Sequence, residues 1–268
     1  MKHVLWIGGP PCAGKTTIAT RLARRHGLRL YSADTRTWEH RDRAIGEGNP
    51  AARRWESLTP AERWERSTPD EMLEMSLYRE RGPMVVDDLG RLPESPLIIA
   101  EGVPLPTSLI ADGIAPPSQV VWLIPTVEFQ DSRLAAVGTT RGHAVLYQLM
   151  RDLIEREARE HHLPTLTVDG SRGLSEMVAV VEQLFADPLA EGPCATTLED
   201  HRALLRDANL AIVTQIRDHG ARPWADGDPD EVTRPFTCEC GDPRCDADVV
   251  LTVREVSARA AIAPGHPA

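Results

Sequence analysis

Close to its start the chain reads Gly9-Pro10-Pro11-Cys12-Ala13-Gly14-Lys15-Thr16. This stretch fits the pattern G-x-x-x-x-G-K-[ST] at every fixed position. The apolar run at residues 4–7 precedes it and predicts a buried strand, and a helix-compatible segment follows from Thr17 to His26 and stops at Gly27. A buried strand, a glycine-containing loop and a helix in this order predict an α/β fold built around the loop.

A loop in this setting points backbone N–H groups and the positive end of the helix dipole at one spot, which suits a polyphosphate. We expect Lys15 to reach the β- and γ-phosphates of a nucleoside triphosphate and the Thr16 hydroxyl to hold Mg²⁺. A glycine-rich turn with a coincidental lysine is the alternative, and the strand–loop–helix order argues against it. The guanine-reading pattern N-K-x-D does not occur in the sequence, so ATP is the expected nucleotide. The expected nucleotide-binding residues of the loop are Gly9, Cys12, Ala13, Gly14, Lys15, Thr16 and Thr17.

The composition limits the classes of protein that need to be considered. A length of 268 residues and a hydrophobic fraction of 41% allow one α/β domain of ordinary size and a smaller appendage. The net charge of −10 argues against general nucleic-acid binding, because phosphate backbones attract basic surfaces. No apolar stretch has the length of a membrane-spanning helix, and the first strand begins too early to leave room for a signal peptide. We therefore expect a cytoplasmic protein without membrane contact, whose five cysteines are thiols or metal ligands rather than disulfides.

Four further segments predict strands of the same sheet, and polar or turn-forming residues follow each of them. They are Leu28 to Ser32, Leu97 to Ala100, Val120 to Ile124 and Leu166 to Val168. Helical stretches lie between them, most clearly at residues 144–161 and 174–185. Strands that alternate with helices predict a parallel sheet covered by helices on both faces. Since ligands gather at the carboxyl ends of such strands, we expect Asp34 and Glu101 beside the phosphate-binding loop.

Residues 1–186 resemble the P-loop small-molecule kinases, the group that contains nucleoside, nucleoside monophosphate, shikimate and gluconate kinases. The resemblance rests on the loop at residues 9–16, the aspartate after the second strand, the run Ile98-Ile99-Ala100-Glu101-Gly102, an arginine-bearing segment after the fourth strand and the turn Val168-Asp169-Gly170. It implies a P-loop NTPase-type three-layer fold. It also implies that Asp34 contacts the accepting hydroxyl, as a base or as an orienting group, and that Asp169 borders the adenine. From the residues alone, Asp34 also suits a helix N-cap and Asp169 a simple strand exit.

Glu101 ends an apolar strand, and we expect it to hold Mg²⁺ through water or to engage the substrate. The run Met84-Val85-Val86-Asp87-Asp88 competes for this role, because a hydrophobic run that ends in aspartate also resembles a Walker B strand. We favour Glu101, since the run before it is more continuous and Gly102 permits close backbone approach. Asp87 and Asp88 are then expected in a solvated turn.

Residues 35–95 are too long and too rich in helix formers for a plain connection between two strands. By the resemblance, this insertion carries the acceptor site, where tryptophan and arginine side chains would stack on and clamp an anionic or aromatic substrate. We expect most of its tryptophans in a small local core and most of its arginines in water. Only Arg36 and Arg41, which lie near Asp34 in the sequence, are expected to bind substrate.

The segment from Glu128 to His143 lies where the resembled kinases place a lid, whose arginines neutralise charge on the transferring phosphoryl group. Glycines flank Thr139 to Arg141 and suit a mobile loop, so Arg141 is the expected lid arginine. Arg133 is expected on a helix surface, and Arg151 in the following helix is a third candidate.

A change of composition marks the C-terminal part of the chain. Residues 187–197 predict a linker, and residues 198–268 a module that begins with a helix up to Gly220. This module is a candidate surface for a protein partner.

Three cysteines of this module, Cys238, Cys240 and Cys245, lie within eight residues and suggest thiolate ligands. His266 is the candidate fourth ligand of a tetrahedral zinc ion. The spacing differs from the paired C-x₂-C of zinc ribbons, so other soft metals and redox chemistry are alternatives. We expect a structural role for the metal, because no general base stands beside the cysteines.

Two functional hypotheses follow. The first is an ATP-dependent phosphotransferase that moves the γ-phosphoryl group to a small hydroxyl- or phosphate-bearing metabolite, with Lys15, Asp34, Glu101 and Arg141 as catalytic residues. The second is a nucleotide-gated ATPase or regulator that acts through residues 198–268. The large insertion and the arginine-bearing lid favour the first hypothesis, and the appended cysteine module favours the second. A kinase fold that only binds the nucleotide is a third alternative.

Overall fold

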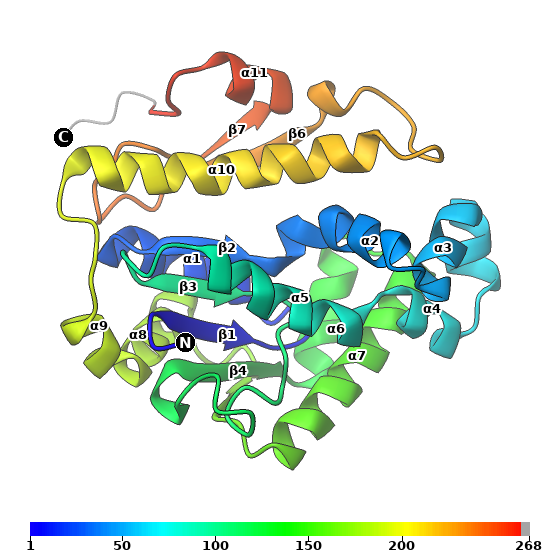
Figure 1. The fold of residues 1–268 in the computed structure, drawn as a ribbon, viewed down its shortest axis with the longest axis horizontal. Helices are drawn as coiled ribbons and strands as arrows, with labels where there is room; N and C mark the ends of the chain where they lie inside the picture. The colour runs from blue at the N-terminus through cyan, green and yellow to red at the C-terminus, as the bar shows by residue number, and fades with distance from the viewer. Residues whose placement is uncertain (264–268) are drawn as a thin grey trace.

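A five-stranded parallel sheet forms the centre of the computed structural model, which describes residues 1–263 (Figure 1). The strand order is β2-β3-β1-β4-β5, with the bounds β1 Val4–Gly8, β2 Arg29–Ser32, β3 Ile98–Glu101, β4 Val120–Pro125 and β5 Thr165–Val168. All five strands were predicted, and their ends agree within one residue. Because β1 lies between β3 and β4, the chain winds to one side of β1 first and to its other side later. This change of direction opens a crevice at the carboxyl end of β1.

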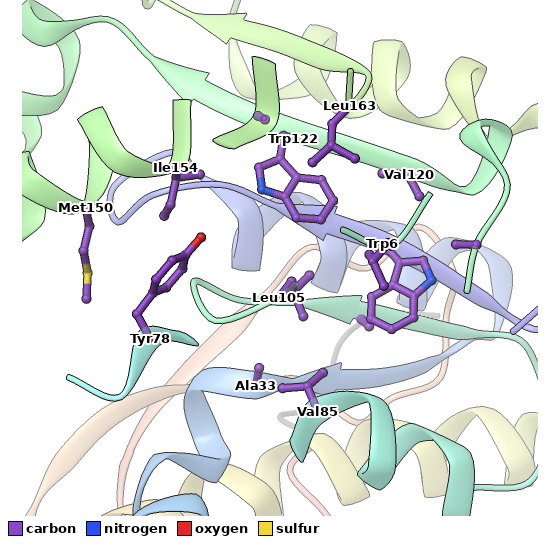
Figure 2. Close-up of a cluster of buried hydrophobic side chains, with 14 of the residues drawn as sticks. Trp6, Ala33, Tyr78, Val85, Leu105, Val120, Trp122, Met150, Ile154 and Leu163 are labelled. Atoms are coloured by element: carbon purple, nitrogen blue, oxygen red, sulfur yellow. The ribbon is translucent and has the colours of Figure 1, made fainter. Parts of the chain in front are cut away.

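Helices cover both faces of the sheet. Val4 and Trp6 of β1 point into one core, and Leu5 and Ile7 point into the other. The first core, where Figure 2 shows Trp6 next to the side chains of neighbouring strands and helices, is closed by α5 (Tyr78–Arg91) and α7 (Arg141–Glu160). The second core is closed by α1 (Lys15–His26) and α8 (Leu174–Leu184). The predicted three-layer α/β fold of P-loop NTPase type is therefore confirmed.

The connection between β2 and β3 is a helical insertion. It consists of a 3₁₀ turn at Ala33–Arg36, α2 (Thr37–Gly46), α3 (Pro50–Ser57), a π-helical turn at Glu62–Arg66, α4 (Pro69–Met75) and α5. A second connecting helix, α6 (Val127–Ala136), joins β4 to α7. Figure 1 shows the insertion and α6 at the carboxyl ends of the strands. Residues from both line the cavity next to the phosphate-binding loop.

The expectation that Asp87 and Asp88 lie in a solvated turn is wrong, because both belong to α5. The apolar residues of this segment recur at helical spacing, with Val85 and Leu89 in the first core. Asp88 faces the sheet and accepts a hydrogen bond from the Tyr31 hydroxyl at 2.7 Å. A run of three apolar residues fits a strand and a buried helix equally well, and here the helix forms.

The C-terminal part has a small core of its own. Helix α9 (Ala186–Glu191) occupies the first half of the segment predicted as a linker, and irregular chain leads from it to α10 (Leu198–Gly220). A 3₁₀ turn at Pro229–Glu231, the antiparallel pair β6 (Thr233–Thr237) and β7 (Asp248–Thr252), and α11 (Val253–Ala258) complete it. The core residues are Val213, Phe236, Leu251, Val253, Val256 and Ile262. Helix α10 lies between this hairpin and the β2 side of the main sheet, and therefore touches both parts (Figure 1).

None of the helices in the part of the chain described has both the length and the apolar character needed to cross a bilayer.

Candidate active site

The phosphate-binding loop between β1 and α1 depends on two glycines. Gly9 has a φ of +132°, and a Cβ atom placed there would lie 2.2 Å from the carbonyl oxygen of Leu123 in β4. Gly14 has a φ of +84° and is the N-cap of α1. Glycine adopts such backbone angles without the strain that a side chain introduces. The loop therefore lies close against the sheet, with the N-terminus of α1 facing the crevice.

Lys15 is the first residue of α1, and its ammonium group is folded back into the loop. Its Nζ donates a hydrogen bond to the carbonyl oxygen of Pro10 at 2.8 Å, and the residue is only 5% exposed. Burial lowers the pKa of Lys15, while the charges of Asp34 and Glu101 act in the opposite direction. A buried ammonium group gains from a nearby anion, which a triphosphate in the loop would supply.

Thr16, near the start of α1, contacts the buried carboxylate of Glu101, which ends β3, and of the two residues only Thr16 lines the cavity beside the loop. The Thr16 hydroxyl donates a hydrogen bond to Glu101 Oε2 at 3.0 Å, and the Ser32 hydroxyl donates to the other carboxylate oxygen. Glu101 is completely buried, and burial together with the charge of Asp34 raises its pKa to about 7. A buried carboxylate of this kind gains from a divalent cation, and Mg²⁺ prefers oxygen ligands. The two residues therefore fit the expected magnesium ion.

Asp34 lies in the 3₁₀ turn that follows β2 and lines the same cavity as the loop. Its Oδ1 accepts a long hydrogen bond from the Val103 backbone at 3.4 Å. Its backbone carbonyl accepts hydrogen bonds from the Thr37 hydroxyl at 2.7 Å and from Gln215 Nε2 at 2.9 Å. No helix within residues 1–263 uses the Asp34 carboxylate as its N-cap. Asp34 thus lines the cavity together with Lys15, and its carboxylate is not taken up as a helix cap.

A cavity of about 900 Å³ runs from the phosphate-binding loop to the insertion. Its nucleotide half lies between the loop, α6 and the start of α8, with the lining residues Cys12, Gly14, Lys15, Thr16, Phe129, Arg133, Val137, Val168, Arg172, Leu174 and Met177. Its other half, called the acceptor half because the hypothesis from the sequence assigns it to an acceptor, lies between the insertion, α7 and α10, with the lining residues Asp34, Trp38, Arg41, Trp55, Trp64, Tyr78, Arg81, His143, Tyr147 and Gln215. The volume is at the upper end of the range usual for ligand sites.

Arg41 is the most unusual residue of the acceptor half. It is 2% exposed, and its Nη2 donates a hydrogen bond to the Met75 carbonyl oxygen at 2.8 Å. Within the described residues, its Nε and Nη1 atoms are buried and have no hydrogen-bond partner. The guanidinium carbon lies 4.4 Å from the centre of the Trp55 ring. Burial lowers the pKa of Arg41, which means that the charged form is destabilised and would gain from an anionic ligand.

Two other arginines of the insertion behave differently. Arg81 also lines the cavity, but its Nε donates to His40 Nδ1 at 3.3 Å and its Nη2 donates to the Ala33 carbonyl oxygen at 2.5 Å. Arg36 is not among the lining residues and forms an exposed ion pair with Glu39 at 2.9 Å. Of the two arginines that the sequence favoured for substrate binding, the structure places only Arg41 in the cavity.

Of the arginines expected in or near a lid, the structure places Arg133, and not Arg141, in the wall of the cavity. Arg141 is the first residue of α7, is exposed and does not line the cavity. Arg133 does line it, together with Phe129 of the same helix and Val137, which directly follows the helix. These three residues are spaced four apart, so they lie on one side of α6 and its C-terminal end, and this spacing was visible in the sequence. Arg151 is engaged by Gln130 at 3.1 Å and by its neighbour Asp152.

Asp169 is exposed where the chain leaves β5, and its Oδ1 accepts hydrogen bonds from the backbone and the hydroxyl of Ser171. It does not line the cavity, whereas its neighbours Val168 and Arg172 do. Sequence reasoning missed Arg172, and the aromatic lining of the acceptor half was expected to be a local core. Trp64 stacks on His143 of α7 with ring centres 3.6 Å apart, so part of this lining joins two distant segments of the chain.

The three cysteines of the C-terminal part are brought together. The sulfur atoms of Cys238, Cys240 and Cys245 all lie within 4.8 Å of one another. Burial raises the pKa of the Cys238 thiol to about 12. Burial alone would also raise the pKa of Cys240, but hydrogen bonds from the Asp242 backbone and the two other cysteines lower it. His266, the candidate fourth ligand, lies outside the described residues.

The phosphate-binding loop, the parallel sheet and the helices on both of its faces define a P-loop NTPase-type α/β protein. No known protein family and no curated protein matches the sequence. Among solved structures, the chain is similar to shikimate kinase from Acinetobacter baumannii in complex with shikimate, with a TM-score of 0.41 and 19% sequence identity. The similarity covers 69% of this chain and 93% of that one.

Proposed function

We propose that this protein is an ATP-dependent phosphotransferase that moves the γ-phosphoryl group to a small hydroxyl- or phosphate-bearing metabolite. One observation carries the proposal: a single cavity joins the phosphate-binding loop to a second half between the insertion, α7 and α10, and Asp34 stands in its wall beside the loop. A protein that only bound or hydrolysed ATP would have no use for this second half. ATP and reduced thiols are typical of the cytoplasm, where the proposal places the protein.

In this proposal, the loop backbone and Lys15 bind the phosphates. Mg²⁺, when bound, neutralises charge on the β- and γ-phosphates, and Thr16 and Glu101 are the residues that would hold it. Asp34 orients the acceptor hydroxyl and takes up its proton as the bond to phosphorus forms. Arg133 on the cavity wall, rather than the exposed Arg141, stabilises charge on the transferred group.

The acceptor half favours an anionic acceptor. Arg41 offers two buried donor atoms without partners, and aromatic rings surround it. A carboxylate or phosphate on the acceptor would accept hydrogen bonds from these atoms and compensate the buried charge. The aromatic walls would contact the rest of the molecule.

The test is Mg²⁺-dependent release of ADP from ATP by the full chain, in the presence of pooled anionic and neutral metabolites that carry hydroxyl or phosphate groups. We expect release that depends on one anionic pool and is lost in Lys15→Ala. The matched control is Lys2→Ala, which changes the only other lysine of the chain and lies outside the cavity. Slow release that no pool changes would contradict the phosphotransferase proposal.

That contrary outcome would favour a nucleotide-gated regulator. One observation supports this second function: Gln215 of α10 donates a hydrogen bond to the Asp34 carbonyl oxygen, so the C-terminal part touches the turn beside the loop. Binding of a protein partner by residues 198–268 that depends on ATP would then be the expected finding.

A further inference from the structure

We propose that Cys238, Cys240 and Cys245 bind one thiophilic metal ion of the zinc type, and that this ion fixes the position of α10 as a wall of the acceptor half. The first part concerns metal binding alone. The second part rests on the proposed function only in calling this half an acceptor site.

The arrangement of the sulfur atoms fits such an ion. Cys238 and Cys240 follow β6 on either side of Glu239, and a left-handed turn at Gly241, with a φ of +80°, returns the chain so that Cys245 meets them. Zinc–sulfur bonds of about 2.3 Å in a tetrahedron place sulfur atoms about 3.8 Å apart. The observed limit of 4.8 Å therefore requires only a small contraction. This is the one group of three potential ligands that the described residues bring together.

The backbone around the cysteines is held by arginines from outside the cysteine segment. Arg24 of α1 donates hydrogen bonds to the carbonyl oxygens of Cys245, at 3.1 Å, and Ala247, at 2.8 Å. Arg202 of α10 donates to the carbonyl oxygen of Cys240 at 3.2 Å. Ligands whose backbone is already fixed lose little entropy when the metal binds.

Glu239 connects the cysteines to α10. It lies between two of the proposed ligands, is 1% exposed, and its Oε1 accepts a hydrogen bond from Asn209 Nδ2 of α10 at 2.8 Å. The same Asn209 side chain accepts from the Thr237 backbone N–H at 2.9 Å and donates to the Thr237 carbonyl oxygen at 2.8 Å. The other carboxylate oxygen of Glu239 accepts from the Ile262 backbone N–H at 2.8 Å. A shift of the cysteine segment would therefore break several buried hydrogen bonds to one turn of α10.

The same helix reaches the acceptor half two turns further on. Gln215, about 9 Å along the axis from Asn209, lines the cavity and donates to the Asp34 carbonyl oxygen at 2.9 Å. Beyond the end of α10, Arg222 donates to the carbonyl oxygen of Trp38 at 3.3 Å, and Trp38 also lines the cavity. Helix α10 thus joins the segment that carries the three cysteines to the turn that carries Asp34, the proposed acceptor-orienting residue.

The segment after α10 also affects Arg41, through the hydrogen bonds that it makes with Glu56. Glu56 is the carboxylate whose charge most favours the protonated form of Arg41, yet it forms no ion pair with it within the described residues. Instead, Trp224 Nε1 donates to Glu56 Oε2 at 2.8 Å, and Arg222 lies 3.5 Å from the other oxygen. The segment after α10 therefore keeps Glu56 occupied and leaves the buried donors of Arg41 for a ligand.

The experiment uses the full chain, reduced and stripped of metal, with Co²⁺ and Zn²⁺ as probes. We expect one ion per chain and, with Co²⁺, a thiolate-to-metal charge-transfer absorption that Zn²⁺ displaces. Cys240→Ser should lose this absorption, while Cys194→Ser, which changes an exposed cysteine outside the cluster, should keep it. Failure of the reduced native chain to bind either ion would overturn the metal site.

Hydrogen exchange with and without Zn²⁺ tests the second part without any acceptor. Removal of the ion should raise exchange in α10 and at residues 33–46 by roughly tenfold, and leave β1 and β4 unchanged. Because this comparison uses the unaltered chain, it stands even if Cys240→Ser does not fold. Metal binding without any change at residues 33–46 would overturn the role of the ion in fixing the wall. Neither result depends on whether the protein transfers phosphate.

Discussion

The phosphate-binding end of the nucleotide half comes from one short stretch, residues 9–17, and side chains of α6, β5 and α8 complete that half. The acceptor half has no such continuous stretch and is made of side chains from segments far apart in the sequence. Asp34 and Gln215, which share a hydrogen bond, are 181 residues apart. A loop of fixed backbone recognises a group that all nucleoside triphosphates share, while side chains from many elements can be exchanged to suit one acceptor. Substitutions in one half should therefore change the binding or turnover that depends on that half and leave the other half unaffected.

The largest effect is expected from Glu101→Gln, which removes the buried charge beside Thr16. We expect turnover to fall on the order of 100-fold or more and the Mg²⁺ concentration needed for half-maximal rate to rise. Binding of ADP without Mg²⁺ should change little, because the loop backbone remains. Steady-state rates across a Mg²⁺ titration measure this. Glu94→Gln, at an exposed glutamate just before β3, is the control, and equal losses in both variants would remove Glu101 from the magnesium site.

Gly9→Ala tests whether backbone really builds the nucleotide half. The added Cβ would meet the Leu123 carbonyl oxygen at 2.2 Å with a φ of +132°, so we expect a loss of about 3 kcal/mol in the free energy of unfolding. Gly14→Ala meets nothing within 4 Å at a φ of +84° and should cost only about 1 kcal/mol. Urea unfolding of the two variants separates the loss of stability caused by the steric clash with Leu123 from the loss caused by the positive φ. Equal losses would show that the sheet does not restrict the loop.

Arg41→Met tests the acceptor half. Once the pooled assay has identified an acceptor, we expect its KM to rise about 30-fold, since charged hydrogen bonds contribute about 2 kcal/mol, while the KM of ATP stays constant. Without ligand, the variant should be as stable as the wild type or more stable, because a buried charge without a counter-ion has been removed. Arg36→Met, at the exposed ion pair, is the control. A large fall in melting temperature with no selective change in KM would instead make Arg41 a structural residue.

The sequence predicted the fold well because its signals are local. The loop at residues 9–16, five apolar strand segments and the periodic helices each lie within about twenty residues, and the structure confirms them. The sequence could decide only in part whether Glu101 or Asp88 ends the strand that carries the expected magnesium-binding carboxylate, because a short apolar run fits a strand and a buried helix alike. The position of Arg133 in the cavity wall could have been predicted, since its spacing of four residues from Phe129 and from Val137 is that of one side of a helix.

The acceptor half could not be predicted, because its geometry is tertiary. Nothing near Arg41 in the sequence indicates that two of its donor atoms lack partners, or that Glu56 is held by Trp224 from the C-terminal part. The stacking of Trp64 on His143 likewise joins segments that local patterns treat separately. The cysteine cluster could be predicted in part. The spacing of the three cysteines already suggested a common site, but only the structure shows that Glu239 connects them to α10 by a hydrogen bond.

The smallest effect is expected from Asp88→Asn, beneath the acceptor half. The Asp88 carboxylate accepts from the Tyr31 hydroxyl at 2.7 Å and lies 2.9 Å from His40 Nε2, while the other ring nitrogen of His40 accepts from Arg81 in the cavity wall. Burial acts to raise the pKa of Asp88, but the hydrogen bonds from His40 and Tyr31 outweigh it and lower the pKa below its usual value.

A carboxylate whose pKa is lower in the folded state stabilises the fold fully above its unfolded pKa, and this stabilisation is lost as the pH falls through the folded pKa. The wild type should therefore exceed Asp88→Asn by about 1 kcal/mol at pH 7, and the difference should shrink as the pH falls below about 4. Urea unfolding at a series of pH values measures this. Asp87→Asn, at a more exposed neighbour paired with Arg43 and Arg91, is the control. A difference that does not depend on pH would show that the hydrogen-bond geometry of Asp88 matters rather than its charge. The polar side chains next to the acceptor half would then stabilise it through the geometry of their hydrogen bonds and not through their charge. The backbone of residues 9–17 fixes the phosphate-binding loop in the same geometric way.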